Sequence, residues 1–367
     1  MYNKEEQMLI WIDSFGLSAK KIETIINISG NVLNLFSAIN ANKMLLESIV
    51  GSALLNKMIT CANDNYLMQM ENTLNKMNIK CITIKSERYP ELLRNISDPP
   101  YVLYLKGNVK ILNSKCIGIV GTRKPTNYGK EMASLFTKKL VQSGLVPVSG
   151  LAFGIDTCVA QTCVDLKLPT IAVLAGGLDG IYPPQNYQLS EQIVAYGGAL
   201  VSEHPPLSKP YPNSFLDRNR IISGLSLGVL VVEAGYKSGA RKTASDAIEQ
   251  NRELFVIPGN INSYASMGCN QLINSMPEAF CTSPDQILQT LNIAINSVAS
   301  KKEVMQFSLT QRMILDCLDY DEISLDDLQE KTGLDGRTML SELTALEIAG
   351  IIKKMPGNYY AKINLPN

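Results

Sequence analysis

The chain has 367 residues, 46% of them hydrophobic, and its 34 basic residues balance 34 acidic ones. This composition is ordinary for a globular protein of two or three domains, and no apolar run approaches the ~20 residues that span a bilayer. The polar, acidic start is unlike a signal peptide, so we expect a cytoplasmic protein without membrane contact. Eight scattered cysteines and a single histidine, His204, argue against disulfides, a zinc site and a Ser-His-Asp triad.

The charge balance is uneven along the chain. Residues 1–80 hold seven basic and seven acidic residues, whereas residues 81–292 hold 19 basic and 16 acidic ones, a net charge of +3. Residues 303–367 hold six basic and 11 acidic residues, a net charge of −5. Any nucleic-acid surface is therefore expected to be a local patch within residues 81–292.

The first 80 residues are predicted to form short helices, because apolar residues recur at helical spacing in 8–12 and 45–50. Gly16 and Gly51 mark turns between them. Small helical domains with glycine turns bind a DNA backbone through loop amides, or they serve in packing and protein contact. The weak glycine signals favour the second role.

Residues 81–292 alternate apolar runs with helical patterns, which predicts parallel βαβ units and an α/β fold. Two leading strands are predicted at 81–84 and 101–105. Five further apolar runs are each followed by glycine, at 115–120, 146–150, 170–175, 227–234 and 254–257. Helical patterns follow at 128–143, 155–167 and 242–252. Because loops after parallel strands open on one edge of a sheet, this edge is the predicted ligand site.

Residues 293–302 are polar and predict a linker to a small C-terminal domain, residues 303–367. Its three helical patterns and a hairpin around Pro356-Gly357-Asn358 predict a winged helix. In DNA-reading versions the third helix enters the major groove. The acidic balance repels phosphate and favours a protein-contact role here.

Four loops at the predicted edge carry residues suited to anions. Their members are Gly121, Thr122 and Arg123; Ser149, Gly150, Gly154 and Asp156; Gly176 and Gly177; and Ser238, Gly239, Arg241, Lys242 and Thr243. Two of these loops also have a structural explanation: Gly121 permits a tight turn, and Asp156 either bonds a sugar or base or caps its helix, which is the commoner role for such a residue. Cations at the start of a helix are unfavourable, so Arg241 and Lys242 suggest an anion there.

A further segment, Arg218-Asn219-Arg220, combines two guanidinium groups with an amide. Phosphate contact is predicted for Arg123 and Arg218, and the alternative for this segment is salt bridging to Asp217 and Glu233. Neither a P-loop nor a Gly-x-Gly-x-x-Gly motif is present, and no nucleophile is paired with a base. We therefore expect no catalytic residues, no metal and no cofactor. Successive anion sites without catalytic groups suit a strand of phosphates.

In this order the motifs resemble those of the DNA-processing protein A (DprA/Smf) family of bacteria, over nearly the whole chain. The resemblance rests on Tyr89-Pro90, Asp98-Pro99-Pro100, Ile119 to Arg123, Ser149 to Ala152, Gly154-Ile155-Asp156, Tyr182-Pro183, Ser202-Glu203, Arg218 to Ile222, Glu233-Ala234, Ser238-Gly239, Thr243-Ala244 and Pro258-Gly259. It implies an extended Rossmann-like domain that binds single-stranded DNA and forms a homodimer. It also implies a sterile-alpha-like or helix-hairpin-like N-terminal domain and a C-terminal winged helix.

The resemblance further implies that the protein protects DNA and loads the RecA recombinase in natural transformation, with single-strand-binding protein as a further partner. The chain departs from the family at Gln161, where members usually have His, and at Arg241-Lys242, where a Leu–Ile pair is usual. An enzymatic alternative also exists. Related sheets hydrolyse nucleoside monophosphates as phosphoribohydrolases, and Glu233 with Gly235 and Thr243 is weakly similar to their sites.

Overall fold

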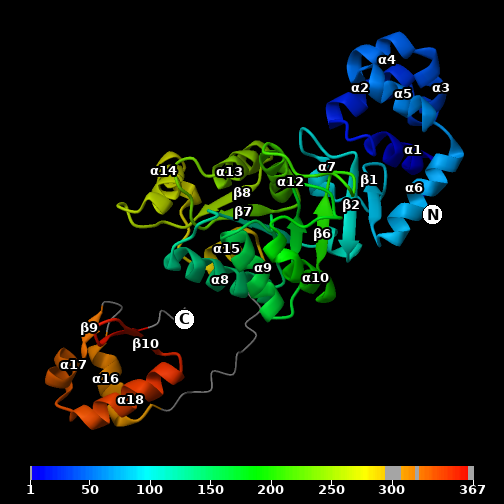
Figure 1. The fold of residues 1–367 in the computed structure, drawn as a ribbon. Helices are drawn as coiled ribbons and strands as arrows, with labels where there is room; N and C mark the ends of the chain where they lie inside the picture. The colour runs from blue at the N-terminus through cyan, green and yellow to red at the C-terminus, as the bar shows by residue number, and fades with distance from the viewer. Residues whose placement is uncertain (1, 294–306, 319–321, 363–367) are drawn as a thin grey trace. The chain divides into compact units, whose positions relative to one another are not determined.

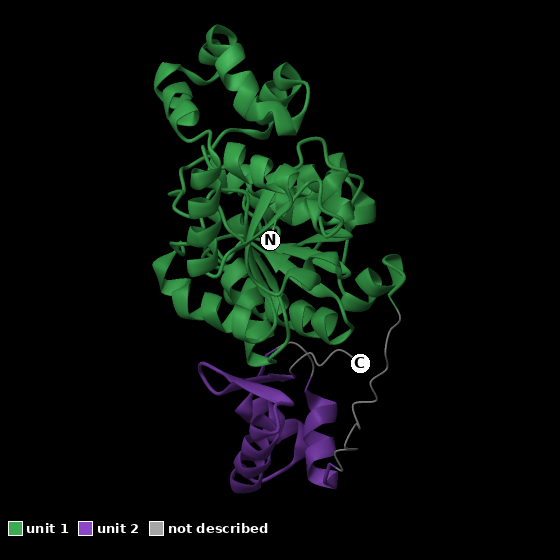
Figure 2. Ribbon diagram, turned by 90° about the vertical axis from the view of Figure 1, so that its right-hand side faces the viewer, with its two compact units in different colours: residues 1–296 green, residues 297–367 purple. Residues whose placement is uncertain are grey.

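The computed structural model describes residues 2–293, 307–318 and 322–362. The chain divides into two compact units, Met1–Asn296 and Ser297–Asn367 (Figure 2). Apart from residue 293, the predicted linker lies outside the described residues. The predicted domain boundary at residue 80 falls within the first unit.

An eight-stranded sheet forms the centre of the first unit, in the order β1-β2-β6-β5-β4-β3-β7-β8 (Figure 1). The six strands from β6 to β8 are parallel, which confirms the predicted α/β fold. Strand β2 pairs antiparallel with both β1 and β6, so β2 alone runs opposite to the other strands, and β1 at the edge runs in the same direction as the parallel six. The strands are β1 Lys80–Thr83, β2 Val102–Gly107, β3 Cys116–Val120, β4 Val146–Ser149, β5 Ile171–Val173, β6 Ala199–Ser202, β7 Gly228–Val231 and β8 Glu253–Val256.

Helices cover both faces of this sheet, as nearly continuous apolar strands require (Figure 1). Ile117 and Ile119 of β3 share one apolar core with helices α8, α9 and α15, whereas Val120 shares another with α7, α12 and α13. The helices are α7 Glu91–Arg94, α8 Asn127–Gln142, α9 Ile155–Asp165, α10 Tyr187–Ala195, α11 Ser214–Asp217, α12 Asn219–Gly224, α13 Ala240–Glu249, α14 Met267–Ser275 and α15 Pro284–Thr290. Short 3-10 turns occupy Val32–Asn34, Val109–Asn113, Pro184–Asn186, Tyr264–Ser266 and Pro277–Ala279.

The N-terminal residues form helices, as their apolar spacing predicts. The helices are α1 Lys4–Asp13, α2 Ala19–Ser29, α3 Leu35–Ala41, α4 Lys43–Val50, α5 Ser52–Thr60 and α6 Asp64–Lys76. Trp11 is fully buried, and its ring meets Phe15 and Phe36 edge-on at centroid distances of 5.2 and 4.8 Å. The Tyr104 hydroxyl of β2 donates a 2.8 Å hydrogen bond to Asp13. These helices therefore share a core with the sheet rather than forming one of their own.

None of the helices in the described part of the chain is, by itself, long and apolar enough to cross a membrane. One bent pair, Ala19–Ser29 with Val32–Ala41, passes the same test of length and composition. Ile22, Ile25, Val32 and Leu35 of that pair are buried in the core shared with the sheet.

The second unit has the predicted winged-helix architecture. It contains α16 Leu309–Cys317, α17 Leu325–Thr332, α18 Gly336–Ile348, β9 Ile323–Ser324, β10 Ile352–Met355 and β11 Tyr359–Lys362. The three strands form a sheet in the order β10-β11-β9. Ser324 caps α17, because its hydroxyl accepts a 3.1 Å bond from the Asp327 amide. Gly333 ends α17 in the left-handed conformation, with φ of 68°.

Candidate nucleic-acid interface

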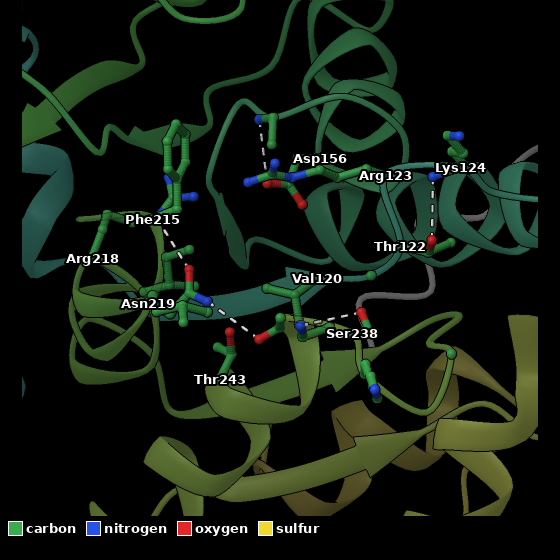
Figure 3. A pocket seen from close by; sticks show the side chains of 18 of the residues that line it. Val120, Thr122, Arg123, Lys124, Asp156, Phe215, Arg218, Asn219, Ser238 and Thr243 are labelled. Carbon is green, nitrogen blue, oxygen red and sulfur yellow. Dashed lines mark hydrogen bonds between the residues drawn. The ribbon is translucent and has the colours of Figure 1, made fainter. Parts of the chain in front are cut away.

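A cavity of about 590 Å³ opens at the carboxyl ends of β3, β4 and β7 (Figure 3). Strand β3 lies between β4 and β7, so the chain crosses over in opposite directions on its two sides. This is the topological switch point at which doubly wound sheets bind ligands. Most of the predicted loops meet here. Residues 120–124, 152, 156, 235, 237–240 and 264–265 line the cavity, together with Pro212, Phe215, Leu216, Arg218, Asn219, Ile222 and Thr243.

The loop after β3 directs two cations to the rim of the cavity. A Cβ on Gly121 would come within 2.5 Å of the Ile155 side chain, so only glycine fits the tight turn. The Thr122 amide donates to the Glu233 carbonyl at 2.7 Å, and the Thr122 hydroxyl accepts from the Lys124 amide at 3.2 Å. Arg123 and Lys124 are exposed beyond this fixed turn.

The Arg123 guanidinium lies over the Phe215 ring, 4.9 Å from its centroid. This contact orients the side chain toward the cavity without neutralising its charge. Neither Arg123 nor Lys124 forms an ion pair within the described ranges. The predicted position of Arg123 at a ligand-facing edge therefore agrees with its geometry, and its contact with phosphate stays a prediction.

The loop after β4 is held by the buried Asp156 carboxylate. It accepts bonds from the amides of Gly150 at 3.1 Å and Ala152 at 3.3 Å. The Ser149 hydroxyl donates to the Ile119 carbonyl at 2.8 Å, so it too is used internally. Gly154 adopts φ of +83°, a conformation that glycine tolerates best. This loop is organised by its own polar groups, which favours the structural explanation for Asp156.

Arg218 has a different environment from the one its sequence context predicts. Only 3% of the residue is exposed, and its guanidinium donates to the Gly150 carbonyl at 2.8 Å and to the Val173 carbonyl. A Cβ on Gly150 would collide with this guanidinium, which explains the glycine. Burial lowers the pKa of Arg218 to about 10, while the Asp156 carboxylate opposes that shift. Burial raises the pKa of Asp156, and Arg218 and the loop amides oppose it.

The internal bonds of Arg218 use its Nε and Nη1 groups, whereas its Nη2 group has no hydrogen bond within the described residues. Its Nε donates to Asn219 Oδ1 at 3.2 Å, and Asn219 Nδ2 donates to the Gly239 carbonyl at 3.3 Å. Arg218 and Asn219 thus join the loops after β4, β5 and β7. Arg218 therefore supports the cavity floor, and its predicted contact with phosphate stays a prediction.

Arg220 is likewise occupied, by acids other than the predicted ones. Its Nη2 meets Glu203 at 2.6 Å and its Nε meets Asp98 at 3.3 Å, in place of Asp217 and Glu233. Burial alone would lower its pKa, but the two carboxylates raise it overall. Arg220 does not line the cavity.

The loop after β7 separates its predicted residues into two groups. Ser238, Gly239 and Thr243 line the cavity, and the Ser238 hydroxyl accepts from the Ala240 amide at 3.3 Å. Arg241 and Lys242 lie outside the cavity lining.

Both of these cations have protein partners. Arg241 donates to the Tyr236 carbonyl at 2.6 Å and lies 5.3 Å from the centre of the Tyr236 ring. Lys242 pairs with Asp246 one turn along α13. Protein groups therefore partly offset the electrostatic repulsion between these two cations and the positive N-terminal end of α13.

The pair Gly176 and Gly177 also lies outside the cavity lining. A Cβ on Gly176 would come within 2.9 Å of the Pro210 side chain, and one on Gly177 would collide with the backbone at Pro205 and Pro206. These glycines allow two backbone segments to approach each other closely, and they do not contact the ligand cavity. The departure at Gln161 is also local, because its amide donates to Asp165 at 2.7 Å.

The structure adds residues that the sequence analysis missed. Lys124 and Lys237 are exposed at the cavity, and Phe215 and Tyr264 contribute aromatic walls. The two lysines directly adjoin the predicted Arg123 and Ser238, so extending each loop by one residue would have found them. Tyr264 has no such signal, because it follows β8 in a segment without a recognised motif.

Glu233, the acid of the enzymatic alternative, is 2% exposed. Its carboxylate accepts from the Thr126 amide at 2.8 Å and from the Thr126 hydroxyl at 2.7 Å. It therefore fixes the start of α8 and does not line the cavity. Within the described ranges, no cluster of three or more His, Cys, Asp or Glu residues is arranged to hold a metal ion.

Comparisons with known proteins agree with this architecture. The family model for DNA recombination-mediator protein A matches residues 80–292, and that for the DprA winged helix domain matches residues 306–358. DNA processing protein DprA of Bacillus subtilis is 45% identical over 208 residues, which cover 56% of this chain and 70% of that protein. Protein Smf of Escherichia coli is 35% identical over 295 residues, 78% of each chain.

Solved structures give the same result. DNA processing protein A from Streptococcus pneumoniae superposes with a TM-score of 0.65 at 30% identity, covering 77% of this chain and 97% of that one. The protein of the same name from Helicobacter pylori, described for its mode of single-stranded DNA binding, gives 0.52 at 31% identity, covering 58% and 95%. Sequence, fold and winged helix agree, and this chain belongs to the DprA/Smf family of DNA-processing proteins.

Proposed function

We propose that this protein binds single-stranded DNA along the loop edge of its sheet. The observation that carries the proposal is that three cations at the rim of the cavity are exposed, whereas Arg218 at its floor is buried. Arg123, Lys124 and Lys237 are exposed at the rim and form no ion pairs within the described part of the chain. Phosphate contacts supply most of the affinity of such proteins, and exposed cations on fixed loops suit them.

The membership of the family supports the same function. The Helicobacter pylori relative is described for its binding of single-stranded DNA. We extend that property to this chain because the rim residues project from the loops of the matched domain, residues 80–292. The aromatic rings of Phe215 and Tyr264 at the same cavity are of the kind on which bases stack.

The phosphoribohydrolase alternative is not favoured. An acid that attacks or activates at a sugar must reach the ligand cavity, and Glu233 is buried against Thr126 outside it. Asp156 lines the cavity, but both of its contacts with loop amides serve the fold. We therefore propose a non-enzymatic role.

In the cell we propose that the protein protects incoming or processed single strands and loads RecA on them during transformation and recombination, in the cytoplasm. Single-strand-binding protein and a second copy of this chain, docked through the Rossmann-like domain, are the further proposed partners. The family supports these partners, and the acidic winged helix, with a net charge of −5 over residues 303–367, suits contact with proteins rather than DNA.

The test is an anisotropy titration with labelled oligo(dT) at several salt concentrations, beside an assay for free base released from AMP. We expect tight binding that weakens steeply with salt, and no release of base. RecA filament assembly on strands coated with single-strand-binding protein then measures loading. Release of base without strand binding would refute the proposal and restore the enzymatic alternative.

A further inference from the structure

A second cavity, of about 320 Å³, lies between the turn that joins α1 to α2, the loop that follows β6 and the segment around α11. Among the described residues, Leu216 alone lines both this cavity and the one at the carboxyl ends of β3, β4 and β7. The exposed cations at the rim of that first cavity, Arg123, Lys124 and Lys237, do not line the second one. The second cavity is therefore a separate site, and the proposed binding of DNA does not explain it.

The lining of the second cavity carries more negative than positive charge, with four carboxylates and two cations. Both cations are already paired. Arg220 is paired with Glu203 and Asp98, and these two carboxylates belong to the same lining. Lys242 is paired with Asp246, which lies outside the lining. The other two carboxylates of the lining are left without a counter-charge, which favours a positively charged ligand.

Asp13, at the end of α1, is the buried one of these two carboxylates. Only 6% of the residue is exposed, and its single side-chain hydrogen bond with a described residue comes from the Tyr104 hydroxyl at 2.8 Å. The titratable groups near it are Tyr104, Cys81, Tyr89 and Glu203, with no cation among them. Burial therefore raises the pKa of Asp13 well above its ordinary value, and a cation bound beside it would favour the ionised form.

Two further acceptors line the same cavity. The Nε2 atom of His204 is buried and has no hydrogen-bond partner among the described residues. Burial lowers the pKa of His204, against the influence of Glu203, so the ring is neutral at pH 7 and has one acceptor nitrogen. With the proton on Nδ1, that acceptor is Nε2. Asp217 is exposed and forms no ion pair with a described residue.

These acceptors match the donors of a protonated amine. An ammonium group has three N–H donors, and Asp13, His204 and Asp217 supply three acceptors. Leu17 and Pro100 add apolar surface that suits a hydrocarbon stem, and the volume is at the small end for ligand pockets. A metal ion is disfavoured, because the described residues include no cluster of His, Cys, Asp or Glu arranged to hold one.

We propose that the second cavity binds a small aliphatic amine, whose ammonium group donates to Asp13, His204 and Asp217. This inference goes beyond the proposed function and does not depend on it. Because the ammonium ion requires an ionised partner, binding releases the proton from the Asp13 carboxyl. The affinity for the amine therefore rises with pH until Asp13 is ionised in the free protein.

The first experiment is a calorimetric titration of the full chain with putrescine and with 1,4-butanediol, a neutral molecule of the same length, at matched ionic strength. Nα-acetyl-lysine amide tests a lysine side chain as the source of the amine. We expect putrescine to bind more tightly than the lysine derivative, and the diol not to bind. Buffers of different ionisation heat should reveal proton release, and affinity should rise by up to about tenfold per unit of pH. Failure of both amines to bind, or equal binding of the diol, would overturn the proposal.

The second experiment changes the acceptors. Asp13→Asn keeps the shape of the side chain and an acceptor for Tyr104, but removes the charge. We expect putrescine to bind this variant at least about tenfold more weakly and without proton release, because a charged acceptor is lost. His204→Phe removes the Nε2 acceptor and should weaken binding about threefold to tenfold.

Glu191→Gln is the matched control, since Glu191 is an exposed acid of α10 outside the cavity lining, and it should bind putrescine as the parent does. If Asp13→Asn does not fold, Asp217→Asn provides the same test at an exposed position. Parent-like affinity of the acid variant that folds, with parent-like proton release, would overturn the assignment of the ammonium site.

Discussion

The mouth of the cavity is the rim at which Arg123, Lys124 and Lys237 are exposed, and its floor is formed around the buried Arg218. The two regions hold arginines in opposite environments. At the mouth Arg123 is exposed, lies over an aromatic ring and forms no ion pair with the described residues, whereas at the floor Arg218 is buried and donates to two carbonyls. An exposed guanidinium has its N–H groups available for a ligand, whereas a buried one donates most of them to acceptors within the protein. The difference teaches that an arginine near a ligand edge is a ligand contact only where the backbone leaves it unpaired.

The largest expected effect comes from breaking the floor. Arg218→Ala leaves the Gly150 and Val173 carbonyls without their donor and the Asp156 carboxylate without its buried counter-charge. Removing one member of a buried charge pair costs about 3 kcal/mol or more. Urea unfolding should show this loss, and strand affinity should fall with it. Arg123→Ala is the matched control, because an exposed cation contributes little to stability.

The next effect sharpens the contrast at the mouth. Arg123→Ala should fold as well as the parent, bind oligo(dT) more weakly, and reduce the magnitude of the salt slope by about 1. The reason is the loss of one phosphate contact and of its released counterion. Arg123→Lys keeps the charge and should keep the slope. An unchanged slope for a well-folded Arg123→Ala protein would show that the mouth does not bind phosphate.

A smaller effect tests the two cations at the start of α13. On helix electrostatics alone, removing both Arg241 and Lys242 should leave the protein at least as stable, with weaker strand binding. The ion pair of Lys242 with the buried Asp246 changes the expectation for stability. Since Lys242 is half exposed, Lys242→Ala should lose at most about 1 kcal/mol.

Arg241→Ala serves as the comparison within this pair. Its side chain forms no ion pair with the described residues and hydrogen-bonds the Tyr236 carbonyl, so thermal melting should hardly change. Anisotropy at two salt concentrations then measures any phosphate contact that Arg241 makes. If affinity and salt slope of both variants equal those of the parent, this pair is surface charge without a role in binding.

The architecture of the sheet was largely predictable, because its strands are apolar runs followed by glycine. Strand β6 escapes prediction, because Ala199–Ser202 is followed by Glu203 and His204 and not by the glycine that marks the other parallel strands. The direction in which neighbouring strands pair was also not predictable from the sequence. The sequence of β2 resembles the sequences of the parallel strands, and only its antiparallel pairing with β1 and β6 shows that it runs in the opposite direction.

The site was predictable in position but not in detail. The loops after parallel strands open on one edge of a sheet, and this rule places Gly121, Arg123 and Ser238 at one cavity, as observed. It does not reveal that the Arg218 guanidinium bonds carbonyls 68 and 45 residues away in the chain. Such contacts depend on which loops the fold brings together, so no local pattern encodes them. The same limit hid the partners of Arg220, which lie 17 and 122 residues distant.

The smallest expected effect concerns the winged helix. Its helix α18 carries Arg337 together with Glu342 and Glu347, and residues 303–367 have a net charge of −5. Such a surface repels phosphate, so removing residues 303–367 should leave oligo(dT) affinity within about threefold, or about 0.7 kcal/mol.

One feature of the winged helix opposes that expectation. Lys353 and Lys354 are both exposed on the hairpin strand β10, although α18 and α17 are acidic. The full chain with Lys353→Ala and Lys354→Ala is therefore the control for the truncation. If the truncated protein loses tenfold or more in affinity and the double variant reproduces that loss, the hairpin binds DNA while the helices do not. If both proteins bind as the parent does, strand binding belongs to the cavity mouth, and the acidic helices are free to contact a protein partner.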